Sequence, residues 1–215
     1  MTEIPDDLHD LAGGPQPRDG LSDEALAVAA GALRRWRNEG KGVTVVAVDG
    51  HGAAGKTTIA QQLSALSGAS VVHTDDFWEP ESEARTGIGI GRYYDVGRLR
   101  REAIEPLRAG REAFFRVFDW ERGALSSRKT HVSPSDLVIV EGVYSAAPLL
   151  ADLVDRAIYV DTPEEERLAR LAGRVAPGEW DWDWLAAEGE YFSASRPAES
   201  FDLVICGSAT GPTLP

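Results

Sequence analysis

The chain has 215 residues, of which 43% are apolar and 27% are charged, the balance of an ordinary soluble globular protein rather than a disordered, fibrous or membrane protein. One domain is the default, because about 150 residues per domain is a common size. The 35 acidic residues outnumber the 22 basic ones, and the formal charge of -13 opposes binding to a nucleic acid polymer or an anionic membrane. A small anionic ligand remains compatible with this charge, since a local loop and a metal ion can bind phosphate.

The first residues lack the pattern of a targeting signal. Residues 1–20 are rich in Pro, Gly and Asp without periodicity, so we expect a loose N-terminal arm followed by a single domain over 21–215. No apolar run approaches the roughly 20 residues that span a bilayer, and we expect a cytoplasmic protein. Cys206 is the only cysteine, which excludes an internal disulfide, and its apolar neighbours favour a buried small side chain.

Apolar periodicity predicts helices that alternate with short strands. A first helix is expected after Ser22, its N-cap, with Asp23 and Glu24 in the first turn. This helix could pack on the sheet or on a second subunit of a homodimer. Short apolar runs rich in β-branched residues predict strands at 43–48, 70–73, 137–140, 157–160 and 203–206.

Stretches of helical length lie between these strands. They cover 56–66, 98–109, 146–154 and 163–174, the last with Thr162 as its cap and Pro163 at its first position. A further strand is expected at 113–118, outside the repeating unit. Strands that alternate with helices predict an α/β fold, a three-layer, doubly wound parallel sheet of about five strands.

A phosphate-binding motif follows the first strand directly and opens a helix. Residues 50–57 read Gly-His-Gly-Ala-Ala-Gly-Lys-Thr and fit the pattern G-x-x-x-x-G-K-[ST]. In this motif backbone amides surround a phosphate, Lys56 lies against the β and γ phosphates of a nucleoside triphosphate, and the Thr57 hydroxyl holds Mg²⁺. The residues assigned to the nucleotide are Gly50, Gly52, Ala53, Ala54, Gly55, Lys56, Thr57 and Thr58.

The motif does not by itself say what is done with the triphosphate. The only asparagine, Asn38, precedes the loop, so the N-K-x-D element that recognises guanine is absent and a GTPase switch is disfavoured. A transferase acting on a small acceptor and an ATPase domain that controls a partner protein both remain.

Acidic residues follow two of the predicted strands, at the edge where ligands of open α/β sheets bind. Asp75 and Asp76 come after the second strand, where one carboxylate could accept a proton from a substrate hydroxyl or help to hold Mg²⁺. Capping of the loop is the alternative role. Glu141 ends an apolar strand in the manner of a Walker B acid and would bind Mg²⁺ directly or through water.

The order of these motifs, from about Val43 to Cys206, resembles the P-loop nucleoside kinases that include uridine-cytidine kinase and nicotinamide riboside kinase. The segment 75–81, Asp-Asp-Phe-Trp-Glu-Pro-Glu, is similar to the Asp-Asp-Phe-Phe element of the second group. The resemblance implies that Asp75 is the catalytic base, that Tyr94 and Asp95 bind the ribose hydroxyls, and that the pair at 141–142 is the family's Glu-Gly element.

The resemblance also implies a short helical lid, expected at about 167–184. The arginines that it would close over the phosphates are Arg167, Arg170 and Arg174. Two alternatives stay open: Arg167 and Arg170 could instead form a solvated helix face that pairs with residues 164–166, and the segment 94–95 could be a simple turn.

The acceptor is not determined by these motifs. Residues 118–123 keep the aromatic-Asp-aromatic core with which uridine-cytidine kinases read the pyrimidine, but Gly123 stands where their histidine falls. Trp180, Trp182 and Trp184 could stack on a base, although packing is the commoner use. The sequence therefore predicts an ATP- and Mg²⁺-dependent kinase for a hydroxyl of a nucleoside or ribosyl compound, with a regulatory ATPase domain as the alternative.

Overall fold

The computed structural model describes residues 22–79, 93–173 and 182–208. Its centre is a parallel sheet with strand order β2-β5-β1-β6-β7, formed by β1 (Thr44–Asp49), β2 (Ser70–His73), β5 (Leu137–Glu141), β6 (Arg156–Asp161) and β7 (Leu203–Cys206). All five predicted strands are present within one or two residues, and the predicted parallel α/β fold is confirmed.

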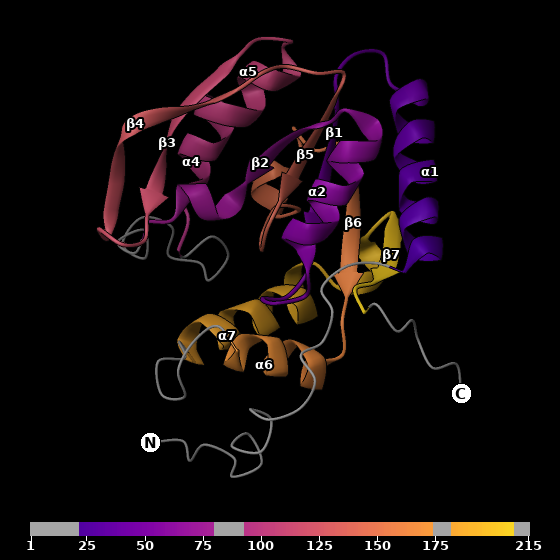
Figure 1. The fold of residues 1–215 in the computed structure, drawn as a ribbon, viewed down its shortest axis with the longest axis vertical. Helices are drawn as coiled ribbons and strands as arrows, with labels where there is room; N and C mark the ends of the chain where they lie inside the picture. Colours follow the sequence, from indigo (N-terminus) through magenta and orange to yellow (C-terminus); the bar gives the residue numbers. More distant parts are fainter. Residues whose placement is uncertain (1–21, 80–92, 174–181, 209–215) are drawn as a thin grey trace.

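Helices cover both faces of the sheet (Figure 1). On one face lie α1 (Asp23–Glu39) and α2 (Lys56–Ser67), which pack against Val46 and Val48 of β1. The opposite side of the same strand, at Val45, packs against a helical segment made of α4 (Val96–Arg98), a π-helical turn (Leu99–Ile104) and α5 (Glu105–Arg108). A strand that is buried on both faces explains the unbroken apolar run in the sequence.

Two further helices lie beyond the carboxyl ends of the strands (Figure 1). They are α6 (Glu164–Ala172) and α7 (Trp182–Glu190), and α7 continues into a π-helical turn over Tyr191–Ser195. The helix predicted at 163–174 is present but shorter, and Pro163 is its N-cap. Thr162 does not cap it, because the Thr162 hydroxyl donates to the carbonyl of Ala54 instead, at 3.0 Å.

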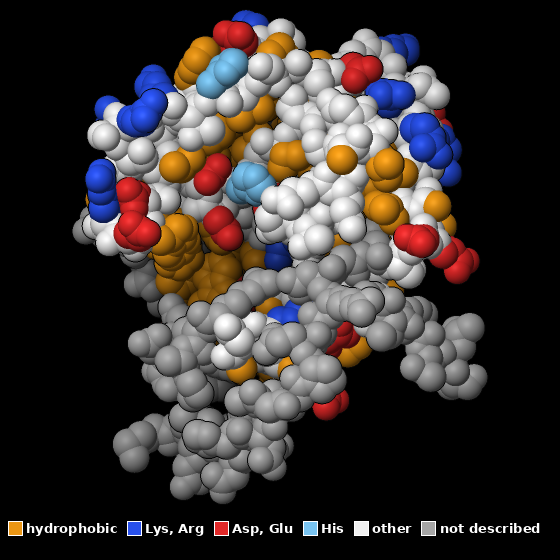
Figure 2. Space-filling view, in the orientation of Figure 1, with side chains coloured by type: hydrophobic (Ala, Val, Ile, Leu, Met, Phe, Trp, Pro, Cys, Tyr) orange, Lys and Arg blue, Asp and Glu red, His pale blue; other side chains and the backbone are white. Residues whose placement is uncertain are grey.

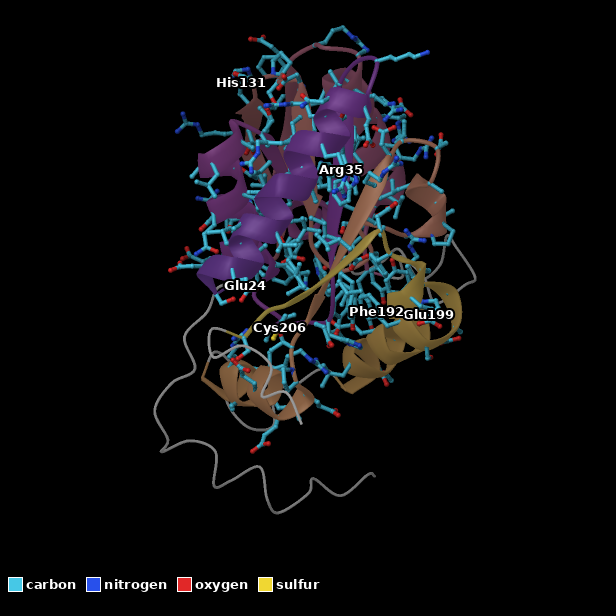
Figure 3. The ribbon with its side chains drawn as sticks, turned by 90° about the vertical axis from the view of Figure 1, so that its right-hand side faces the viewer. Glu24, Arg35, His131, Phe192, Glu199 and Cys206 are labelled. Carbon is cyan, nitrogen blue, oxygen red and sulfur yellow. The ribbon has the colours of Figure 1, made fainter. Side chains whose placement is uncertain are left out.

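The first helix begins as the sequence predicts. Ser22 is the N-cap of α1 and its Oγ accepts from the backbone N–H of Ala25, at 3.2 Å. Ala29, Leu33 and Trp36 bury the inner side of the helix against α2 and the sheet. Within the described residues this helix packs on its own sheet, as one of the two predicted alternatives requires; Figure 3 shows it along the face of the molecule.

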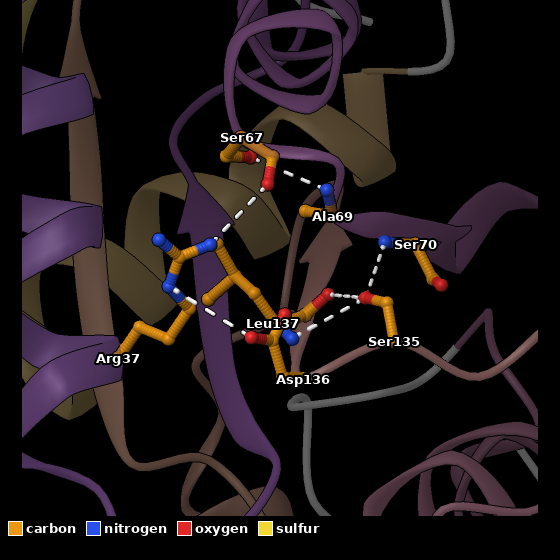
Figure 4. Close-up of polar contacts among 7 residues, drawn as sticks. All are labelled: Arg37, Ser67, Ala69, Ser70, Ser135, Asp136 and Leu137. Carbon is orange, nitrogen blue, oxygen red and sulfur yellow. Dashed lines mark hydrogen bonds and ion pairs between the residues drawn. The ribbon is translucent and has the colours of Figure 1, made fainter.

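A network of polar contacts joins the elements at the opposite, amino-terminal edge of the sheet (Figure 4). Ser135 Oγ accepts from the N–H of Ser70 at the start of β2 and from that of Leu137 at the start of β5. Arg37 of α1 donates to the carbonyl of Ser67 and pairs with Asp136. These contacts connect α1, α2, β2 and β5 and thereby fix the relative position of the strands.

One expectation about the middle of the chain is wrong, and one strand there was not predicted. The helix predicted at 146–154 is only a short 3₁₀ turn (Pro148–Leu150), in which the amides of Leu150, Ala151 and Leu153 bond to the carbonyl groups three residues before them. The strand predicted at 113–118, outside the repeating unit, is confirmed as β3 (Ala113–Asp119), and it pairs antiparallel with an unpredicted β4 (Ala124–Val132). β4 is mostly exposed and polar, so it has no apolar alternation to reveal it.

Two details of the described residues concern the surface. No helix among them combines the length and apolar character needed to cross a bilayer. Cys206 at the end of β7 is a free thiol and is half-buried rather than buried (Figure 3).

Gly142 gives a direct test of the packing at the strand ends. It follows β5 with φ +128°, and a Cβ there would lie 1.8 Å from Thr74 Oγ1. We expect Gly142→Ala to lower the free energy of unfolding by about 2 kcal/mol or more, from overpacking and backbone strain. Urea denaturation measures the loss. Gly189→Ala is the control, because nothing lies within 4 Å of its Cβ; equal stability of the two variants would contradict the close approach.

Candidate active site

The phosphate-binding motif forms a loop between β1 and α2, at the carboxyl edge of the sheet. Three residues of the loop have positive φ: Gly50 at 149°, Ala53 at 60° and Gly55 at 92°. Lys56 begins α2, is 7% exposed, and donates through Nζ to the carbonyl of His51 at 2.8 Å. The amides of the first helical residues have no acceptor within the helix, so they and the helix dipole can bind an anion.

Three further side chains donate to carbonyl groups of the loop. Arg167 donates to Gly52 O at 3.5 Å, Arg170 to Ala53 O at 3.2 Å, and Thr162, as described above, to the next carbonyl. These bonds direct the carbonyl groups of the loop toward α6. The structure thus places two of the predicted lid arginines against the backbone of the loop.

Glu141, Thr57 and His73 meet at the end of β5. Glu141 is 4% exposed, and its Oε1 accepts from Thr57 Oγ1 at 3.1 Å and bonds to His73 Nδ1. The parallel register makes this contact, since His73 of β2 pairs directly with Glu141. The bond to Glu141 raises the pKa of His73 above its usual value, against the opposing effect of burial.

The hydroxyl of Thr57 and the carboxylate of Glu141 are hard oxygen donors that suit Mg²⁺. Their separation of 3.1 Å matches the distance of about 3 Å between neighbouring ligands of an octahedral ion with bonds of about 2.1 Å. Among the described residues no group of three or more His, Cys, Asp or Glu side chains could hold a metal ion. A cation here would therefore need further oxygen ligands from water or a phosphate, which is the usual case for Mg²⁺.

Asp75 faces the loop across a cavity of about 380 Å³. Its Oδ1 accepts from the hydroxyl of Tyr94 at 2.6 Å, and Tyr94 is 4% exposed. Burial raises the pKa of the Tyr94 phenol well above its usual value, so this side chain donates and does not ionise. Asp76 does not line the cavity, and burial raises the pKa of its carboxyl to about 6.

The cavity joins the phosphate loop to a wall of aromatic rings. We refer to it as the central cavity; the loop and helix residues that line it are Gly52, Ala53, Gly55, Lys56, Thr57 and Thr58, and the remainder are Asp75, Trp78, Tyr94, Trp120, Glu141, Gly142, Val143, Leu171, Trp184, Leu185 and Glu188. Figure 2 shows a hollow with apolar, acidic and basic side chains around it on the same face. The arrangement can hold an anion beside a flat organic ligand.

Known proteins are similar to this chain in sequence. The chain is 30% identical over 146 residues to a uridine kinase from Lactiplantibacillus plantarum, a match that covers 64% of this chain and 70% of that one. A uridine kinase from Limosilactobacillus reuteri is 26% identical over 146 residues, with 63% and 66% covered. The chain belongs to the P-loop nucleoside kinase family. It is therefore a small-molecule kinase, a phosphotransferase, although no model of a known protein family matches it.

Solved structures agree with this assignment. A protein described as a possible uridine kinase from Bacillus stearothermophilus superposes with a TM-score of 0.64 at 25% identity, covering 85% of this kinase and 97% of that chain. A protein named for a fructose transport system kinase from Silicibacter superposes with a TM-score of 0.61 at 23% identity, covering 84% and 98%, and shows the shared fold.

Several predicted site residues of the kinase lie outside the central cavity. The carboxylate of Asp95 caps α4 by accepting from the N–H of Arg98 at 2.8 Å, and Asp95 does not line the cavity. Arg170 is 3% exposed and bonds to Glu166 at 2.6 Å as well as to the loop, so it is neither solvated nor directed at the cavity. Gly50 and Ala54 belong to the loop but not to the cavity wall, and Arg174 lies outside the described residues.

The sequence predicted only part of the aromatic wall of the central cavity, which consists of Trp78, Tyr94, Trp120 and Trp184. Trp184 lines the cavity and its ring lies 5.6 Å from that of Trp78 and 5.7 Å from that of Tyr94. It is thus both packed and available to a ligand. Trp180 and the side chain of Trp182 are outside the described part of the structure. Trp120, in the segment compared with the pyrimidine-reading element, is 60% exposed and also lines the cavity.

Sequence reasoning missed Asp49, the last residue of β1. Its carboxylate is fully buried and accepts from the amides of Gly50 and Ala146 and from the hydroxyl of Tyr191, at 2.8, 2.9 and 2.8 Å. Burial raises the pKa of Asp49 to about 6 although these bonds oppose the rise. An aspartate that ends an otherwise apolar strand, directly before the loop, was the available signal. Asp49 connects the loop, through Gly50, to Tyr191 in the segment that follows α7.

Phe192 adds a second contact between that segment and the loop. It follows Tyr191 in the π-helical turn (Figure 3), and its ring is 4.4 Å from that of His51. The segment after α7 therefore supports the loop through a hydrogen bond and through ring packing.

The Tyr191 hydroxyl gives a pH-dependent test. Asp49 has an ordinary pKa of 3.8 and a raised pKa of about 6 when folded, so its ionisation lowers stability as pH rises between these values. Tyr191→Phe removes a donor to the charged form and raises this pKa further. We expect a loss of about 2 kcal/mol at about pH 8 and about half of that at about pH 5, where the carboxyl is largely protonated.

Urea denaturation at both pH values measures these losses. Tyr159→Phe is the control, because Tyr159 is a buried member of the same aromatic cluster and is not among the hydrogen-bond partners of Asp49. A loss for Tyr191→Phe that is equal at the two pH values would contradict the coupling to Asp49.

Proposed function

We propose that the chain is an ATP- and Mg²⁺-dependent kinase that transfers the γ-phosphate to a hydroxyl of a nucleoside or a similar ribosyl compound. The observation that carries the proposal is one cavity lined by the phosphate loop, by Asp75 and by aromatic rings. A regulatory ATPase domain has no need for an acceptor space of this kind. The names of the uridine kinase relatives support the nucleoside class.

Donor binding falls to the loop. The amides at the start of α2 and the ammonium of Lys56, once it leaves the carbonyl of His51, would hold the β and γ phosphates. Thr57 and Glu141 would hold Mg²⁺, as their donor chemistry and separation fit this ion. The bound ion would neutralise charge on the transferring phosphoryl group.

Acceptor activation falls to Asp75. Its Oδ1 is occupied by the hydroxyl of Tyr94, which leaves Oδ2 to accept the proton of the substrate hydroxyl. The substrate oxygen then forms a bond to the γ-phosphorus while the bond from that phosphorus to the β–γ bridging oxygen breaks, and ADP leaves with the electron pair. The Tyr94 bond fixes the orientation of the carboxylate. Positioning of reacting groups in this way is a main contribution that a protein makes to phosphoryl transfer.

The remaining predicted residues have supporting roles. Trp78, Trp120 and Trp184 would stack on the base or ring of the acceptor, since aromatic faces bind flat ligands. Asp95 and Arg167 are proposed to contact the sugar and the substrate, for which Asp95 would have to release the N–H of Arg98 and Arg167 the carbonyl of Gly52. Arg170 would have to release Glu166 to reach a phosphate, and with Arg174 it is proposed to act on the charge that develops in transfer.

Mass analysis of acceptors tests the proposed reaction. The protein is incubated with Mg-ATP and uridine, cytidine, adenosine, nicotinamide riboside, pantothenate or simple sugars, and both ADP release and the acceptor mass are followed. A nucleoside or ribosyl compound that gains one phosphate is the expected result. ADP release without a phosphorylated acceptor would contradict the kinase assignment of the site, and phosphorylation of pantothenate alone would contradict the nucleoside class.

Asp75→Asn tests the base. The variant keeps the size and the contact with Tyr94 but cannot take a proton at neutral pH, so we expect ATP binding to be retained and turnover to fall by about 10²-fold or more. Asp76→Asn is the matched control, because this neighbouring carboxylate does not line the cavity, and its turnover should stay within a few-fold. Turnover of Asp75→Asn near that of the control would remove Asp75 from the role.

A further inference from the structure

Glu188 of α7 is a buried carboxylate in contact with the phosphate loop, and the reaction proposed above does not use it. Its Oε2 accepts from the backbone N–H of Gly52 at 2.9 Å and lies 3.4 Å from His51 Nδ1. The side chain is fully buried, yet it lines the central cavity. Sequence reasoning could not find this residue, because Glu188 is 136 positions from Gly52.

The Glu188 carboxylate lies close to the loop, and among the described residues only one of its two oxygens accepts a hydrogen bond. A Cβ on Gly52 would lie 3.0 Å from Glu188 Oε1, so the glycine allows the carboxylate to approach the loop. Oε1 is buried and has no hydrogen-bond partner in the described part of the chain. A buried, half-partnered carboxylate is costly unless another arrangement satisfies it.

A carboxylate on a loop amide occupies the kind of position in which such loops hold phosphate. Both groups are anionic oxygen acceptors, and both are favoured by backbone amides beside the N-terminus of α2. Two anions cannot share one amide and would repel each other in a buried cavity. Among the described residues Lys56 forms no ion pair with Glu188, and its Nζ donates to the carbonyl of His51 instead.

We propose that Glu188 is a positioning residue that competes with a nucleotide phosphate for the amide of Gly52. Phosphate binding displaces the carboxylate and thereby shifts α7. Because α7 also carries Trp184, a ring of the aromatic wall of the cavity, that ring moves with the helix. Tyr191, one turn further on, stays bonded to Asp49 and anchors the segment while Glu188 moves. Donor binding thus changes the shape of the acceptor space. This inference rests on the proposed function only in that the loop binds a nucleoside phosphate.

The test is the affinity for Mg-ADP in the absence of acceptor. Glu188→Gln keeps the size and the bond to Gly52 but removes the charge, so it competes less well with a phosphate. We expect Mg-ADP to bind about tenfold more tightly to this variant than to the unaltered protein, by calorimetric titration. Glu190→Gln is the matched control, because Glu190 is exposed on the same helix and its loss changes the net charge equally; its affinity should be unchanged.

Movement of α7 has its own measurement. Mg-ADP should change the tryptophan emission of the unaltered protein, and the change should be lost in Trp184→Phe. If Glu188→Gln folds less well, the increase in melting temperature caused by Mg-ADP is compared within each variant, because this increase reports binding whatever the starting stability. Glu188→Asp keeps the charge and should not gain affinity as Glu188→Gln does.

The outcomes separate the two proposals. Affinity for Mg-ADP that is equal or weaker in Glu188→Gln, beside normal binding by the unaltered protein, would overturn the competition and leave the proposed function intact. Tighter binding without a Trp184 signal would overturn the coupling to α7. Failure of the unaltered protein and of every variant to bind Mg-ADP would overturn the proposed function together with this inference.

Discussion

The parallel register of β2, β5 and β1 is the constraint on which the site depends. Glu141 is paired with Val48 on one side and with His73 on the other. This register ends three strands at one level, so that the loop after β1, the acid at the end of β5 and the turn after β2 meet around one cavity. A shift of one residue in β5 would turn the Glu141 side chain to the other face of the sheet and remove it from Thr57.

Electrostatics is the second constraint, because the site concentrates negative charge. Asp75, Glu141 and Glu188 line the cavity, and Lys56 is the one cationic side chain among its described lining residues. A triphosphate adds more negative charge, so binding it without a cation would be unfavourable. Arg167 and Arg170 of α6 reduce this repulsion, because they donate to two loop carbonyl groups and so offset the partial negative charge on those oxygens. The chemistry of the site therefore favours a metal-bound donor.

Local sequence patterns predicted the frame well because their causes are local. The cap at Ser22, the β-branched runs and the loop at 50–57 each act within a few residues, and each was found in the structure at its place. The helix expected at 146–154 is replaced by turns with bonds three residues apart, which an amphipathic spacing does not distinguish from an α-helix. The strand β4 was not predicted, because its side chains are mostly exposed and polar and leave no apolar alternation in the sequence. In both places the local pattern does not distinguish the structure that forms.

The same reason explains why the site was predicted only in part. Motif residues such as Lys56, at the start of α2, and Glu141, at the end of β5, are positioned by the elements they belong to, so a local pattern reveals them. Tyr191 and Glu188 reach the loop from a helical segment more than 130 positions away, and only the packing of α7 brings them there. Their two contacts differ in kind: the Tyr191 bond adds a donor to a buried acid that needs one, whereas Glu188 places a second acid on an amide that suits a phosphate. One end of the segment is therefore held by a satisfied bond, and the other by a bond that a stronger anion can replace.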